Sequence, residues 1–177
     1  MGCCSSRAMN KIEISKMIHS YIIEMRLDAH TCSSIKRLDV QILEETIDAQ
    51  TYESLTKGWD IKAPFELFSK GNKIFKKDLK IAFLLFSRDS FEKKVQLFKE
   101  LTNSDKREII HLLEIRNELL YMRIPTQLAK QNKISDEDKN EYVENKRLVS
   151  GKEASHALQS YLHSSEEELK RLDFISI

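Results

Sequence analysis

The chain has 177 residues, of which 41% are hydrophobic and 32% are charged, a composition that excludes a largely disordered protein. The net charge of +1 lacks the basic excess of nucleic-acid-binding proteins, so no nucleic-acid partner is expected. With only 4 Gly and 2 Pro, a fold built from many tight turns is also disfavoured.

The first seven residues, Met-Gly-Cys-Cys-Ser-Ser-Arg, match the pattern for N-terminal myristoylation at Gly2. A single myristoyl chain binds membranes only marginally, with an association constant of about 10⁴ M⁻¹. Cys3 and Cys4 supply sites for palmitate, and a second acyl chain makes anchoring stable. The pattern therefore predicts a lipoprotein whose residues 1–10 form a flexible tail. The tail would bind lipid at the cytoplasmic face of the plasma membrane or a ciliary membrane. The alternative is an unmodified tail.

The rest of the chain has helical periodicity, with apolar residues recurring every three or four positions. These stripes predict helices over residues 11–28, 35–47, 76–86, 91–101 and 109–120, the last ending before Pro125. Further helices are expected from Ser135, over 154–162 and from Ser165. Strand-like alternation is absent, so the predicted fold class is all-α.

Short polar stretches separate these helices, and the first of them fits the frame of a 12-residue cation-binding loop. In this frame Asp28 stands at position 1, Ile35 at position 8 and Asp39 at position 12. Positions 3 and 5 hold His30 and Cys32, which leaves two carboxylates for an ion that takes six to eight oxygen ligands. We therefore expect no bound metal and no cofactor, with calcium disfavoured, and Asp28 and Asp39 as the candidate ligands if one loop does bind an ion.

The middle of the chain carries a family resemblance. Residues 65–79 read Phe-Glu-Leu-Phe-Ser-Lys-Gly-Asn-Lys-Ile-Phe-Lys-Lys-Asp-Leu, with a Phe-x-x-Phe pattern, a Gly-Asn turn, Ile74 at position 8 and a helix starting at Lys76. This resembles the EF-hand family, particularly its acylated members related to neuronal calcium sensors and calcineurin B. Only Ser69 and Asp78 remain as oxygen ligands in this loop.

Three further segments extend the resemblance. Residues 83–101, with Ser-Arg before Glu-Lys, are similar to the join between the second and third hands of those sensors. A third loop would run over 102–113 with Ile109 at position 8, and a fourth over 145–153 with Val149 at position 8. The resemblance implies paired, degenerate helix-loop-helix hands in two lobes, residues 11–90 and 91–177.

In this family, paired hands expose an apolar groove that holds an amphipathic helix of a partner, and calcium controls the opening. The resemblance therefore implies a membrane-tethered, calcium-independent adaptor that binds an unidentified protein. The candidate groove residues are Trp59, Phe65, Phe68, Phe83, Phe86 and Phe98, although residue by residue the internal core is the favoured place for most of them. No enzyme is expected, because the phosphate-loop, Gly-x-Ser-x-Gly and His-Glu-x-x-His motifs are missing.

Two alternatives stay open. The chain could be a calcium sensor that uses the loop over residues 28–39, in which case calcium binding would distinguish it from the adaptor. It could also be a structural subunit of a membrane-associated cytoskeletal or ciliary assembly, which a stable, salt-resistant complex would favour.

Overall fold

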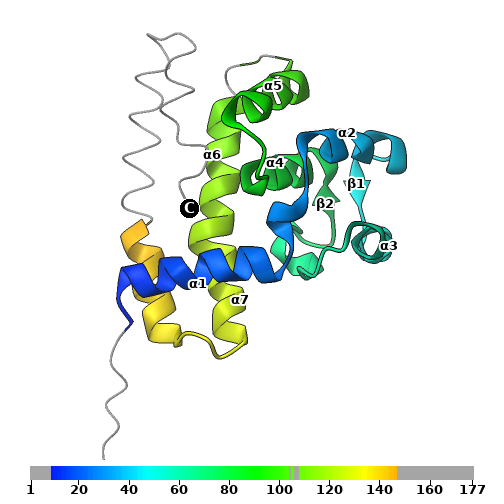
Figure 1. The fold of residues 1–177 in the computed structure, drawn as a ribbon. Helices are drawn as coiled ribbons and strands as arrows, with labels where there is room; N and C mark the ends of the chain where they lie inside the picture. The colour runs from blue at the N-terminus through cyan, green and yellow to red at the C-terminus, as the bar shows by residue number, and fades with distance from the viewer. Residues whose placement is uncertain (1–8, 104, 106–107, 147–177) are drawn as a thin grey trace, which may run out of the picture.

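The computed structural model describes residues 9–103, 105 and 108–146, and this part of the chain is mostly helical (Figure 1). The all-α class is confirmed in this coarse sense, with one short β-ribbon added. The lipidation residues Gly2, Cys3 and Cys4 lie outside the described residues, as do almost all of the fourth loop and the helices expected after residue 153.

The first half of the described chain holds these elements: α1 (Lys11–Glu24), the 3₁₀ turn η1 (Leu27–Ala29), α2 (Cys32–Gln41), β1 (Thr46–Ile47), α3 (Ala49–Trp59), the 3₁₀ turn η2 (Phe65–Leu67), β2 (Ile74–Phe75) and α4 (Lys76–Phe86). The second half holds α5 (Phe91–Thr102), α6 (Glu108–Glu118), the π-helical turn η3 (Leu119–Arg123) and α7 (Ile124–Lys130). A further helix covers residues 136–146.

Side-chain caps explain where several helices begin. The Asn10 side chain accepts from the Glu13 N–H at 2.9 Å, and the Glu13 carboxylate accepts from the Asn10 N–H at 2.8 Å, which forms a capping box at the start of α1. Thr31 caps α2 in the same way with Ser34. The Asp48 carboxylate accepts from the Thr51 N–H at 2.7 Å and begins α3.

Several sequence predictions need correction. The helix expected over 35–47 is wrong in its second half, because α2 ends at Gln41 and the chain then forms β1. Ile35, expected at loop position 8, lies inside α2, and Ile109 lies inside α6. Pro125 does not end its helix, because the π-helical turn η3 leads directly into α7 and places the proline in the first turn.

The β-ribbon joins two helix-flanked loops. Strands β1 and β2 are antiparallel, with Thr46 opposite Phe75 and Ile47 opposite Ile74. Both isoleucines are fully buried. The Lys76 N–H extends the ribbon by donating to the Glu45 carbonyl at 2.9 Å. The ribbon thus holds α2-β1-α3 against η2-β2-α4, to the right of α4 in Figure 1.

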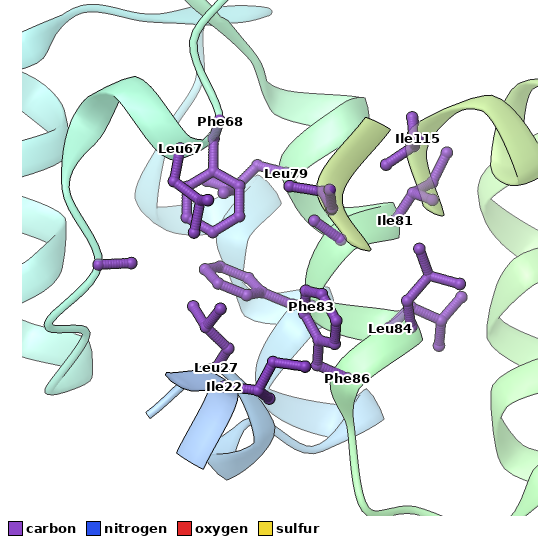
Figure 2. Close-up of a cluster of buried hydrophobic side chains, with 14 of the residues drawn as sticks. Ile22, Leu27, Leu67, Phe68, Leu79, Ile81, Phe83, Leu84, Phe86 and Ile115 are labelled. Carbon is purple, nitrogen blue, oxygen red and sulfur yellow. The ribbon is translucent and has the colours of Figure 1, made fainter. Parts of the chain in front are cut away.

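Helix α4 lies at the centre of the core and packs against α2, α5 and α6. Figure 2 shows Phe83 near Leu27 and Phe68 on one side of α4, and Ile81 towards Ile115 on the other. Buried residues from both halves of the described chain belong to one hydrophobic cluster, and α1 packs against α7. The division into two lobes therefore stays a prediction.

The central position of Phe83 gives a first prediction. We expect Phe83→Ala to lower the free energy of unfolding by about 3–5 kcal/mol, because it removes a fully buried ring from a packed core. Phe75→Ala is the matched control, since Phe75 is 46% exposed and should cost no more than about 1 kcal/mol. Urea unfolding of both variants measures the difference, and equal losses would contradict this account of the core.

Candidate functional site

A buried lysine at the start of α4 defines the candidate site. Lys76 is 8% exposed, and its Nζ donates to the Ile42 carbonyl oxygen at 3.2 Å. The same Nζ lies 3.7 Å from Asp39 Oδ1 and 3.6 Å from Glu45 Oε1. A positive charge is disfavoured in the first turn of a helix, so these three oxygens, not the helix dipole, stabilise the ammonium here. Carbonyl and carboxylate oxygens are also the ligands that calcium takes.

A second lysine, one turn further along α4, completes this charge cluster. Lys80 is 5% exposed, and its Nζ lies 2.5 Å from Asp39 Oδ2. Each oxygen of the Asp39 carboxylate therefore faces one lysine of α4. Buried ammonium groups are costly unless paired, so Asp39 is needed to hold both lysines in place.

The second loop, between η2 and β2, is also held by cationic side chains. The two predicted ligand residues of this loop are Ser69 and Asp78. Arg123 Nη1 donates to the Ser69 carbonyl at 2.8 Å and to the Leu67 carbonyl at 2.9 Å. Asp78 Oδ2 accepts from Lys70 Nζ at 3.0 Å, and its Oδ1 lies 2.8 Å from the His111 Nε2 atom. The backbone carbonyl of Ser69 and both carboxylate oxygens of Asp78 are thus contacted by the chain's own cations and a histidine.

The turn between the loop's two ends depends on glycine. The backbone of Lys70 donates to the Lys73 carbonyl at 2.8 Å, and Gly71 between them has a φ of 66°. This left-handed conformation favours glycine because it has no Cβ.

The structure does not bring Asp28 and Asp39 to one cation. Asp28 Oδ2 accepts from Arg88 Nε at 2.6 Å, whereas Asp39 faces the lysines of α4. Helix α2 begins at Cys32, which stood at position 5 of the proposed loop. With a rise of 1.5 Å per residue, the helix separates its own first residue from Asp39 by about 10 Å. The loop frame over residues 28–39 is therefore wrong.

The linker after α4 also anchors the start of α2. The Asp89 carboxylate accepts from the Cys32 N–H at 2.5 Å, and this bond lowers the pKa of Asp89. Burial, together with a hydrogen bond to Asp89, raises the pKa of the Cys32 thiol to about 11. Cys32 is therefore an unreactive thiol at neutral pH.

The six aromatic residues predicted to line a groove lie in or against the core. Phe83, Phe68, Phe86 and Phe98 are buried, while Trp59 and Phe65 are half-buried. The Phe83 ring lies 5.8 Å from the rings of Trp59 and Phe68. In this conformation the six residues pack in or against the core of the described part of the chain, which agrees with the internal-core alternative, and their contact with a partner stays a prediction.

His30 belongs to the same aromatic cluster, 4.6 Å from the Phe83 ring and 5.0 Å from the Trp59 ring. Its Nε2 atom is buried and has no hydrogen-bond partner among the described residues. Burial, and then the neighbouring Arg26 charge, lower the pKa of His30 below its usual 6.5, against the opposing effect of Asp28 and Asp60.

Sequence reasoning missed Lys76 and Lys80 as members of the site. The available signal was their spacing, because both share a helical face with Leu79 and Phe83, which are core residues. A lysine on an otherwise apolar helix face either packs its aliphatic part on the core and extends its ammonium to solvent, or forms a buried ion pair. Only the three-dimensional structure distinguishes the two.

Within the described residues, no group of three or more His, Cys, Asp and Glu side chains is arranged to hold a metal ion. None of the described helices is both long and apolar enough to cross a membrane. Comparison with known proteins finds no matching family model, no matching curated protein and no matching solved structure.

The Lys76 contacts give a second prediction. Lys76→Met should lower the free energy of unfolding by about 1–3 kcal/mol, because the Ile42 carbonyl loses its donor. Lys77→Met is the control. Lys77 is 40% exposed and pairs with Glu108 near the surface, so its loss should cost at most about 1 kcal/mol. Urea unfolding compares the two variants. If Lys76→Met loses no more unfolding free energy than Lys77→Met, the Lys76 contacts do not stabilise the fold as described.

The buried imidazole gives a third prediction. The unfolded chain takes up a proton at His30 below about pH 6.5, whereas the folded chain resists it, so stability should fall as the pH drops from 7. We expect this fall to be shallower in His30→Phe, by up to about 1.4 kcal/mol per pH unit. Thermal unfolding between pH 7.5 and about 5.5 measures both slopes, and identical slopes would contradict the assignment.

Proposed function

We propose that this chain is a membrane-tethered adaptor of EF-hand-like architecture that binds a partner protein without calcium control. The observation that carries the proposal is the Lys76 ammonium, which contacts the Ile42 carbonyl and the Glu45 carboxylate of the first loop, between α2 and β1, together with the Asp39 carboxylate near the end of α2. The N-terminal acylation pattern supports the membrane tether.

The β-ribbon supports the EF-hand likeness. In that family the residues at position 8 of two neighbouring loops pair with each other, and Ile47 pairs with Ile74 here. Counting from these residues, position 12 is Thr51 in the first loop and Asp78 in the second. Thr51 cannot supply the bidentate carboxylate that calcium takes at position 12, and Asp78 is engaged by Lys70 and His111.

Loss of the calcium switch is expected because the chain's own cationic side chains already contact the loop oxygens. An ordinary sensor opens when calcium enters its loops and changes the angle between the helices. A covalently attached ammonium neither enters nor leaves, so the loop pair keeps one arrangement at every calcium concentration. Calcium that gains no preferred contacts in an open arrangement of the loops cannot shift the equilibrium towards it.

The partner would meet the surface that remains exposed beside the loops. Val40 and Leu43 are 81% and 84% exposed, and Phe75 is 46% exposed. All three belong to or flank the two paired loops. Such apolar side chains suit the apolar face of an amphipathic helix, the recognition mode implied by the family resemblance.

Membrane attachment is tested by cell fractionation. We expect the wild-type chain in the membrane fraction and Gly2→Ala in the soluble fraction, because that variant cannot be myristoylated. The double variant Cys3→Ser/Cys4→Ser should be mostly soluble, because one myristoyl chain anchors only marginally. A Gly2→Ala chain that stays with membranes at the wild-type level would overturn the acyl anchor.

Calcium-independent binding is tested by covalent cross-linking to partners in native membranes. We expect the wild-type chain to capture the same proteins, in the same amounts, with saturating calcium and with a chelator. The double variant Val40→Ser/Leu43→Ser should capture less of them in both conditions. Capture that appears only with calcium would contradict the proposal and favour a sensor.

A further inference from the structure

Helix α1 presents an exposed face that the core does not use. Ile12 is 68% exposed and Ile23 is 41% exposed, and the step of eleven positions from one to the other makes about three helical turns, which places both on one side. Lys16 and His19 are exposed and lie on the same side between them. The opposite side, with Ile14, Ile18 and Ile22, is buried.

The charges on α1 favour a negative surface as its counterpart. The Glu13 carboxylate accepts from the Asn10 N–H, and Glu24 pairs with Lys133 at 2.8 Å. Lys11 and Lys16 are exposed and have no ion pair among the described residues. The acidic groups of α1 are therefore engaged within the protein, while its lysines stay available.

The position of α1 in the chain places it next to the proposed anchor. Lys11, its first residue, follows Gly2 by nine residues. Even fully extended, nine residues span at most about 30 Å. Acyl chains inserted at Gly2 and at Cys3 or Cys4 would therefore keep the start of α1 within that distance of the lipid headgroups.

We propose that this outer face of α1 lies on the anionic cytoplasmic surface of the membrane, which rests on the membrane attachment proposed above. The two isoleucines insert at the boundary between headgroups and acyl chains. Lys16, on the same face, contacts anionic headgroups, and Lys11 reaches them with its long side chain from the flank of the first turn. The contact fixes the orientation of the tethered protein, which the acyl anchor alone leaves free.

The test replaces acylation by a chemical tether. The unacylated full-length chain is coupled through Cys3 and Cys4 to maleimide lipid in vesicles that contain phosphatidylserine and brominated lipid, which quenches tryptophan. Cys32 is buried and does not compete for the coupling. Ile23→Trp carries the test because it lies at the end of α1 far from the tether. Val40→Trp, at another exposed apolar position, is the control, and Trp59 is a background common to both.

We expect strong quenching for Ile23→Trp and none above the Trp59 background for Val40→Trp. Equal quenching of the two, or no quenching of Ile23→Trp, would overturn the proposal. Because the tether is chemical, this result does not depend on acylation in cells, whereas the Gly2→Ala fractionation tests only acylation. The two proposals can therefore fail separately.

Charge reversal tests the part played by the lysines. Each basic residue at an anionic surface contributes about fivefold to binding, so Lys11→Glu/Lys16→Glu should lower the ratio of bound to free α1 by at least about 25-fold. Lys11→Glu places a negative charge in the first turn, which stabilises the helix and offsets the repulsion between Glu13 and the glutamate introduced at position 16. Quenching of Ile23→Trp that is unchanged in this background would contradict the proposed lipid surface.

Discussion

The arrangement of the paired loops depends on Lys76, whose positive charge is unfavourable both at the start of a helix and in a buried position. Lys76 begins α4, and the same helix carries the centre of the core through Leu79 and Phe83. The start of a helix repels a positive charge, and a buried ammonium has lost its water. Both costs are offset by the Ile42 carbonyl and the carboxylates of Asp39 and Glu45. The contact therefore fixes the end of α2 and the first loop against α4.

Cationic side chains of the protein contact both loops, but they come from different parts of the chain. Lys76 of α4, the helix directly after the ribbon, contacts the first loop. The second loop is contacted by Arg123 of the π-helical turn and by its own Lys70. Arg123 also pairs with Glu118 at 2.6 Å, which keeps its guanidinium in place. A side-chain cation cannot dissociate as calcium can, so such loops gain permanence and lose the capacity to respond. This is the physical basis for proposing an adaptor and not a sensor.

The sequence predicted some local features correctly and missed others. The start of α4 at Lys76 and the extent of α5 follow from strong apolar periodicity, and both predictions are confirmed. The pairing partner of Ile74 was not predicted. A two-residue strand leaves almost no pattern, and the Asp48 cap that begins α3 was overlooked, so Ile47 was assigned to a helix. The burial of Lys76 and of the aromatic cluster depends on contacts between distant segments, which local periodicity cannot reveal.

The most direct test of the account is a calorimetric titration of the purified full-length chain with calcium, in the presence of magnesium at its cellular level. If the ammonium of Lys76 and the cations of the second loop occupy the oxygens that an ion would need, the titration will show no saturable heat. A saturable heat at micromolar calcium would contradict the account, because a loop would then exchange its internal cation for a metal ion.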